Sequence, residues 1–76
     1  MASDETLDCY DELGMTPLLY AVFRGDVLYV RNLLLKGADP NRPQRDDPTC
    51  TPLWHARDNF GLVAIAELLV EYGAQQ

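Results

Sequence analysis

The chain has 76 residues, of which 47% are hydrophobic and 24% are charged, and its formal net charge is −6. A chain of this size forms one small domain, near the lower limit at which a single core sustains a fold. Its twelve acidic residues outnumber six basic ones, a balance that repels phosphate backbones and anionic lipid, so we expect no nucleic acid or membrane partner and favour a basic protein.

The N-terminal segment, residues 1–10, is acidic and is expected to be a solvated end, a partial cap on the fold, or a docking patch for basic side chains. It contains no apolar signal core, and no stretch of the chain approaches the roughly 20 apolar residues of a membrane helix. Cys9 and Cys50 lack CxxC spacing and are expected to be reduced thiols, with a disulfide between them as the alternative. These features predict a cytoplasmic protein.

A first pair of helices is predicted after Thr16. Thr16-Pro17 is a helix start, because a threonine hydroxyl can cap a free backbone N–H and proline tolerates the first helical position. Gly25 can adopt the left-handed conformation that ends a helix, and Gly37 is expected to end the next one. Apolar residues follow helical spacing in this second helix, at Val27, Val30, Leu33 and Leu34.

The same pattern returns about 35 residues later. Thr51-Pro52-Leu53 repeats Thr16-Pro17-Leu18 at an offset of 35, whereas Gly61 lies 36 residues after Gly25, so the second copy carries one extra residue within residues 57–60. Gly73 is expected to end the last helix. Its apolar positions are Val63, Ala66, Leu69 and Val70. Self-similarity at this period indicates stacked units, each a pair of antiparallel helices with a projecting turn.

Residues 11–41, DELGMTPLLYAVFRGDVLYVRNLLLKGADPN, resemble the ankyrin repeat family in the patterns D-x-x-G-x-T-P-L and L-L-x-x-G-A-D-x-N. The resemblance continues to residue 74, with Asp46 placed like Asp11, five residues before its threonine. It implies an all-α fold, a short ankyrin-type solenoid of two helix-turn-helix repeats with projecting turn or hairpin fingers. The expected domain is 11–76, with repeat 1 at 11–41, a loop at 42–45 and repeat 2 at 46–74.

In the second copy, Thr49 replaces the glycine of the hairpin and Phe60 is the candidate inserted residue. Leu19 and Trp54 stand where the family has a histidine. Trp54 is expected to lie in the core.

By resemblance, the protein binds other proteins without catalysis, through a concave surface made by the fingers and first helices. The residues expected there are Asp11, Glu12, Leu13, Met15, Phe23 and Arg24 in the first copy and Asp46, Asp47, Pro48, Cys50, Asp58 and Asn59 in the second. Leu13, Met15 and Phe23 are expected to form an exposed apolar patch. In the alternative, Leu13 and Met15 pack against residues 1–10 and Phe23 against a neighbouring helix. The carboxylates of Asp11, Glu12, Asp46 and Asp47 are expected to orient a basic partner.

Catalysis, metal binding and nucleotide binding are not expected. Cys50 and His55 are the candidates for a nucleophile and its base, but His55 lies one turn inside a helix and is expected to face solvent. One histidine and two separated cysteines do not make a four-ligand zinc set. The glycines form no phosphate-binding motif, so no cofactor is expected.

Two units are fewer than the three that a solenoid generally needs. The apolar face of residues 63–70 is therefore expected to pack on a second copy of the chain or on an obligate partner. Three alternatives to the binding module stay open: a subunit buried in a larger assembly, an acidic inhibitor or immunity protein that covers a basic enzyme, and an enzyme that uses Cys50 and His55.

Overall fold

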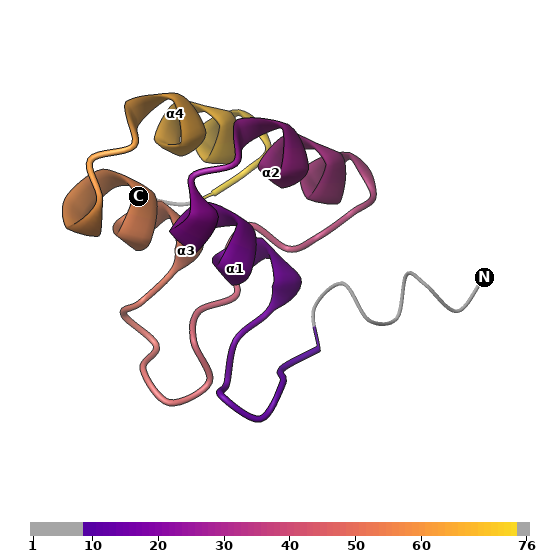
Figure 1. Ribbon diagram of the computed structural model, residues 1–76, viewed down its shortest axis with the longest axis vertical. Helices are drawn as coiled ribbons and strands as arrows, with labels where there is room; N and C mark the ends of the chain where they lie inside the picture. The colour runs from indigo at the N-terminus through magenta and orange to yellow at the C-terminus, as the bar shows by residue number, and fades with distance from the viewer. Residues whose placement is uncertain (1–8, 75–76) are drawn as a thin grey trace.

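The computed structural model describes residues 9–74, which form two helix pairs stacked side by side (Figure 1). In the first pair, α1 (Pro17–Arg24) is followed by α2 (Val27–Leu35). In the second pair, α3 (Pro52–Trp54) runs directly into the π-helix η2 (His55–Asn59), and α4 (Val63–Glu71) follows. Every regular element in this part of the chain is helical, which confirms the predicted all-α fold. None of these helices is long and apolar enough to cross a membrane.

Each pair begins at the threonine that the sequence indicated. The Oγ1 of Thr16 accepts a hydrogen bond from the backbone N–H of Leu19 (3.2 Å), and that of Thr51 accepts one from the N–H of Trp54 (3.0 Å). Gly25 and Gly61, which follow the first helix of each pair, have φ angles of 69° and 68°. The left-handed helix ends predicted at these glycines are therefore confirmed.

The core lies between the two pairs. The helix α1 packs against α3 and η2 while α2 packs against α4, and Figure 1 shows α2 and α4 as one layer with α1 and α3 as the other. The larger buried side chains are Leu18, Val22, Val30, Leu33, Leu34, Leu53, Ile65 and Leu69. Ala66 and Leu69, two residues of the predicted open face, are buried in this core, whereas Val63 and Val70 are exposed.

Two loops project from the side of the molecule that carries α1 and α3 (Figure 1). We call residues 11–15 the first finger and residues 44–50 the second finger. The second finger is closed by a hydrogen bond from the Gln44 N–H to the Cys50 carbonyl (3.1 Å) and by an isolated antiparallel bridge between Gln44 and Asp47. Both fingers lead directly into a capped first helix, so their positions are set by α1 and α3.

Candidate protein-binding surface

The first finger is built around the carboxylate of Asp11. Its Oδ1 accepts hydrogen bonds from the N–H groups of Leu13 (2.9 Å) and Met15 (3.0 Å), and the Tyr20 hydroxyl donates to its Oδ2. The Tyr20 hydroxyl and these N–H groups lower the pKa of Asp11, since they favour its charged form. The Asp11 carboxylate therefore holds the finger, and its predicted attraction of a basic partner stays a prediction.

Asp47 has the same place in the second finger. Its Oδ1 accepts from the Thr49 N–H (3.1 Å) and hydroxyl (2.7 Å), and the Cys50 Sγ–H donates to its Oδ2 (3.2 Å). The Thr49 hydroxyl is the largest cause of the lowered pKa of Asp47, followed by the Cys50 thiol. In both fingers the aspartate carbonyl also accepts from the N–H three residues on, in Gly14 and in Cys50 (3.0 Å each).

The predicted equivalence of Asp11 and Asp46 is therefore wrong, because Asp47 makes the turn. The second turn lies one residue closer to its helix than the first. The first finger uses Gly14 at a φ of 77°, and the second finger carries no glycine. Among residues 9–74 every positive φ belongs to a glycine, so the second finger closes by a different turn. Asp46 is exposed and pairs with Arg45 at 3.6 Å.

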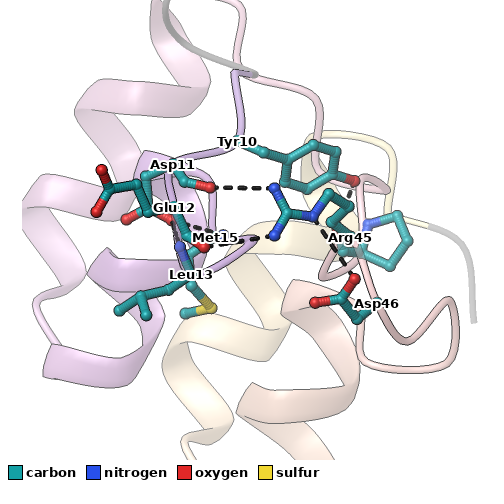
Figure 2. A network of polar contacts seen from close by, with 8 residues as sticks. Tyr10, Asp11, Glu12, Leu13, Met15, Arg45 and Asp46 are labelled. Carbon is teal, nitrogen blue, oxygen red and sulfur yellow. Dashed lines mark hydrogen bonds and ion pairs between the residues drawn. The ribbon is translucent and has the colours of Figure 1, made fainter.

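Arg45 joins the two fingers (Figure 2). Its backbone N–H donates to the Gly14 carbonyl (3.0 Å), and its guanidinium donates from Nη1 to the Asp11 carbonyl (3.3 Å) and from Nη2 to the Glu12 carbonyl (3.4 Å). Beside it, the Tyr10 hydroxyl donates to the Pro43 carbonyl (2.7 Å). The first finger is therefore held against the second by several bonds. Arg45 was expected in a connecting loop, and its contact with the first finger was not predicted, because backbone carbonyls leave no signature in a residue pattern.

The predicted apolar patch at the fingers is partly wrong. Leu13 projects from the first finger and is 72% exposed, but Met15 is only 7% exposed. The N–H of Met15 is bound to the Asp11 carboxylate and its carbonyl accepts from the Asp11 N–H (3.0 Å), so the base of the finger turns this side chain inward. Glu12 and Pro48 are exposed like Leu13. Leu13 is therefore the exposed apolar side chain of the first finger, and Met15 is buried.

Three exposed aromatic rings surround the ring of His55: Phe23 of α1, Trp54 of α3, and Phe60 just after η2. We call them the aromatic patch. The ring of Phe23 meets that of Phe60 edge-on at a centroid distance of 5.2 Å, and each of the three contacts the ring of His55 at between 4.6 and 5.8 Å. Their exposed fractions lie between 36% and 45%. Trp54 was expected in the core and is half-exposed instead.

Phe60 reaches this patch because of the extra residue within residues 57–60. The Phe60 N–H bonds to the carbonyl five residues earlier, in His55 (2.8 Å), which defines the π-helical turn of η2. A π-turn is the usual way in which a helix accommodates one inserted residue, and such turns often occur at functional sites. The inserted residue was predicted from the repeat, but the position of Phe60 in the aromatic patch was not predicted. The aromatic patch thus needs both copies, because Phe23 comes from the first copy and Trp54 and Phe60 come from the second.

His55 lies beneath the patch and is 4% exposed, so the expectation that it faces solvent is wrong. Its Nε2 is 2.8 Å from Oε1 of Gln44, and its Nδ1 is 3.1 Å from the amide nitrogen of Asn59. These partners fit a neutral ring that donates from Nε2 and accepts at Nδ1. Asn59, a predicted binding residue, therefore supports His55, which positions the rings around it.

The remaining predicted site residues divide into two groups. Asp58 is bound to Arg57 (3.2 Å), and Arg24 is exposed at the end of α1, so both lie at the surface. Burial raises the pKa of the Cys50 thiol, and its bond to Asp47 raises it further. The thiol therefore stays protonated, while both nitrogens of His55 are engaged with Gln44 and Asn59. Cys50 and His55 do not form the hydrogen-bonded pair that an activated nucleophile needs.

The burial of His55 predicts a pH-dependent stability. Burial lowers the pKa of His55 from its ordinary value of 6.5, an effect that the charge of Asp47 opposes in part. The unfolded chain therefore binds a proton at a higher pH than the native protein does, and the free energy of unfolding should fall as the pH drops below about 6.5. Urea unfolding at about pH 7.5 and about pH 5 measures this change.

The matched control is His55→Gln, which cannot titrate in this range. Its stability should change less over the same interval, because Asp11 and Asp47 have lowered pKa values and titrate only under more acidic conditions. Equal pH dependence in the two proteins would contradict the role given to His55.

Two comparisons with known proteins agree with this architecture. A family model described as ankyrin repeats (3 copies) matches residues 2–76. The chain is also 37% identical over 68 residues to the E3 ubiquitin-protein ligase Ufd4 of Drosophila melanogaster. That match covers 90% of this chain, which spans about 2% of the length of the ligase.

Proposed function

This chain belongs to the ankyrin repeat family, and on that premise we propose that it binds a basic protein partner, without catalysis, through its fingers and aromatic patch. Ankyrin repeats generally mediate protein–protein interaction. The observation that carries the proposal is the set of three exposed rings, Phe23, Trp54 and Phe60, packed around the buried ring of His55. The ligase chemistry named for the Drosophila relative belongs to a protein of which this chain matches a small part.

The aromatic patch has the properties of a binding hot spot. Aromatic side chains contribute large contact areas and few rotatable bonds, and tryptophan is enriched among the residues that dominate binding energy. Here the rings are also fixed before binding, since each contacts His55 and since Phe23 contacts Phe60. The fingers are fixed in the same way by Arg45. A surface ordered in advance loses little entropy on docking.

The charges around this surface favour a partner that carries lysine or arginine. Glu12 and Asp46 are exposed on the fingers, and Asp58 is exposed on η2. Asp46 forms an exposed pair with Arg45, and such pairs are weak, so Asp46 can exchange partners. Asp11 and Asp47 add to the negative field while their oxygens stay in the finger turns. A net charge of −6 should speed encounter with a basic protein and make it sensitive to salt.

The test is affinity capture from native extract, with the bound proteins identified by mass spectrometry for three versions of the chain. The double variant Phe23→Ser, Phe60→Ser should lose the proteins that the wild type retains. The variant Leu28→Ser removes an even more exposed apolar side chain, on α2, and should keep them. Circular dichroism verifies that both variants are folded. Retention of the same proteins by the double variant would disprove the assignment of this surface.

A second candidate function is that of a subunit held in a larger assembly by the open end of the helix stack. The observation that favours it is a groove of about 380 Å³ on the outer side of the second helix pair, lined mainly by apolar side chains. None of the residues that line this groove belongs to the aromatic patch, so one molecule could use both surfaces.

A further inference from the structure

The side-chain amide of Asn59 connects the buried ring of His55 to the surface. Asn59 is the last residue of η2 and is exposed, whereas His55 is buried beneath the aromatic patch. The amide nitrogen of Asn59 lies 3.1 Å from Nδ1 of His55, so it donates a hydrogen bond to the neutral ring. Because the amide is planar, its oxygen Oδ1 is turned away from the ring. Within residues 9–74 this oxygen accepts no hydrogen bond, so it is available to a donor from a partner.

A proton added to the ring changes the bond to Asn59 and leaves the bond to Gln44 intact. The other ring nitrogen, Nε2, already carries a hydrogen and donates it to Oε1 of Gln44 at 2.8 Å. The second proton therefore goes to Nδ1, where it faces the hydrogens of the Asn59 amide, and two donors cannot bond to each other. A half-turn of the amide about its last bond removes the conflict, because this torsion has two nearly equivalent states. Oδ1 then accepts from Nδ1–H, and the amide N–H groups face outward.

The charge that acts on His55 comes from the second finger. The negative charge of Asp47 favours the protonated ring, but burial is the larger effect and lowers the pKa of His55 from 6.5. Asp47 itself stays ionised in this range, because hydrogen bonds from Thr49 and Cys50 lower its pKa. The rings packed against His55 are uncharged. Among residues 9–74, no other charged side chain acts on the ring, including those of Arg24 in α1, Arg57 and Asp58 in η2, and Glu67 in α4.

We propose that His55 and Asn59 form a proton switch in the binding surface, which binds a basic partner while the ring is neutral and releases it when the ring is protonated. This regulation rests on the proposed function, because it acts on the same surface. Lysine and arginine side chains carry donors only, so they suit the outward Oδ1 of the neutral state and not the outward N–H groups of the protonated state. The positive charge of the protonated ring opposes a basic partner as well.

Both effects have the same sign, so the partner and the proton compete. Since such coupling is reciprocal, a bound basic partner should also make His55 harder to protonate. The pH at which release occurs must lie below about 6.5, because burial holds the pKa of His55 below this value.

The first experiment follows the switch by NMR in the 76-residue chain, between about pH 7.5 and about pH 5. The ¹⁵N shifts of His55 should show the Nε2–H form at the higher pH, and the side-chain amide signals of Asn59 should move with the same midpoint as the ring. Circular dichroism verifies that the chain is folded throughout. Amide signals of Asn59 that do not follow the titration of His55 would overturn the switch.

Two substitutions of Asn59 give a matched test of the contact. Asn59→Asp places a carboxylate of the same shape beside Nδ1 and should raise the midpoint of His55, whereas Asn59→Leu offers no acceptor and should lower it. The two midpoints should differ by roughly 1–3 pH units, the usual effect of one close opposite charge. Equal midpoints in these variants would show that Asn59 does not respond to the proton.

The second experiment measures release. Its probe is the set of proteins that the wild type retains from native extract and the Phe23→Ser, Phe60→Ser variant loses. At equal ionic strength, the wild type should retain at least about fivefold less of this set at pH 5 than at pH 7.5, the lower end of typical coupling between two ligands. The ratio between the two pH values should be smaller for His55→Gln, because titration of the captured proteins themselves affects both chains equally.

Equal ratios for the wild type and His55→Gln would overturn the switch and leave the binding function standing. Retention of none of these proteins at pH 7.5 would instead overturn the proposed function, and the regulation with it. The two failures are therefore distinguishable.

Discussion

Replacing Leu69 with alanine is expected to remove a large part of the stability of this protein. Leu69 lies in α4, is fully buried, and belongs to the core that joins the two helix pairs. Truncating such a leucine costs about 2–5 kcal/mol, from lost apolar burial and from the cavity that is left. A domain of 76 residues has a total stability of about 4–11 kcal/mol. The Leu69→Ala variant should therefore lose a large fraction of this stability and unfold at a clearly lower urea concentration than the wild type.

Urea unfolding followed by circular dichroism measures this loss, and Leu28→Ala is the matched control. Leu28 lies on α2 and is 67% exposed, and both variants replace a leucine in a helix with alanine. The replacement of Leu28 should therefore change the free energy of unfolding by about 0.5 kcal/mol or less. A Leu69→Ala protein as stable as the Leu28→Ala protein would show that the two pairs do not depend on a shared core.

The same variant tests whether the helix pairs fold as one unit. The core contains residues of α1 and α2 as well as of α3 and α4, and α2 packs directly against α4. Loss of Leu69 should therefore unfold the first pair together with the second, in a single transition. A first pair that stays folded would give a second transition at higher urea concentration.

The local signals in this sequence predicted the positions of the helices well. The caps of Thr16 and Thr51 depend on one hydroxyl and on N–H groups a few residues away, and the left-handed ends at Gly25 and Gly61 depend on one residue type. The extra residue in the second copy was also visible, because the repeat gives an internal ruler. Each of these features is decided within one turn of helix, so a single sequence suffices to find it.

Burial was predicted less well, because it depends on neighbours that are distant in the sequence. Met15 and His55 are buried, although one was expected at the surface as an anchor and the other in solvent. Trp54, in contrast, was expected in the core and is exposed. The burial of His55 depends on distant parts of the chain, because His55 is held by Gln44, eleven residues away, and contacts Phe23 of the first copy.

The acidic residues show the same division between local and distant causes. Asp11 and Asp47 were predicted as binding charges on account of their position next to the fingers, but the turns themselves require their oxygens. The contact of Arg45 with two backbone carbonyls could not be inferred from residue types at all. The location of the fingers could thus be predicted from the sequence, whereas the contacts that hold the fingers together could not.

Gly14→Val is expected to be the most damaging change at the fingers. Gly14 has a φ of 77°, where a β-branched residue is strained, and a Cβ atom there would stand 3.2 Å from the Cβ of Arg45. Gly61 has a similar φ of 68° and open space around it, so Gly61→Val carries the backbone strain without the contact. The strain costs roughly 1–2 kcal/mol in either variant.

At Gly14 the new side chain also presses on the residue that holds the fingers together, so its loss of stability should exceed that of Gly61→Val by about 1 kcal/mol. The Gly14 variant should in addition release the first finger, since the Arg45 N–H bonds to the Gly14 carbonyl itself. Urea unfolding measures the first effect, and faster hydrogen exchange at the Leu13 and Met15 N–H groups measures the second. Equal stability of the two variants would show that the contact between the fingers contributes little. Protection at Leu13 and Met15 that is unchanged in Gly14→Val would show that the Asp11 carboxylate orders the first finger without help from Arg45.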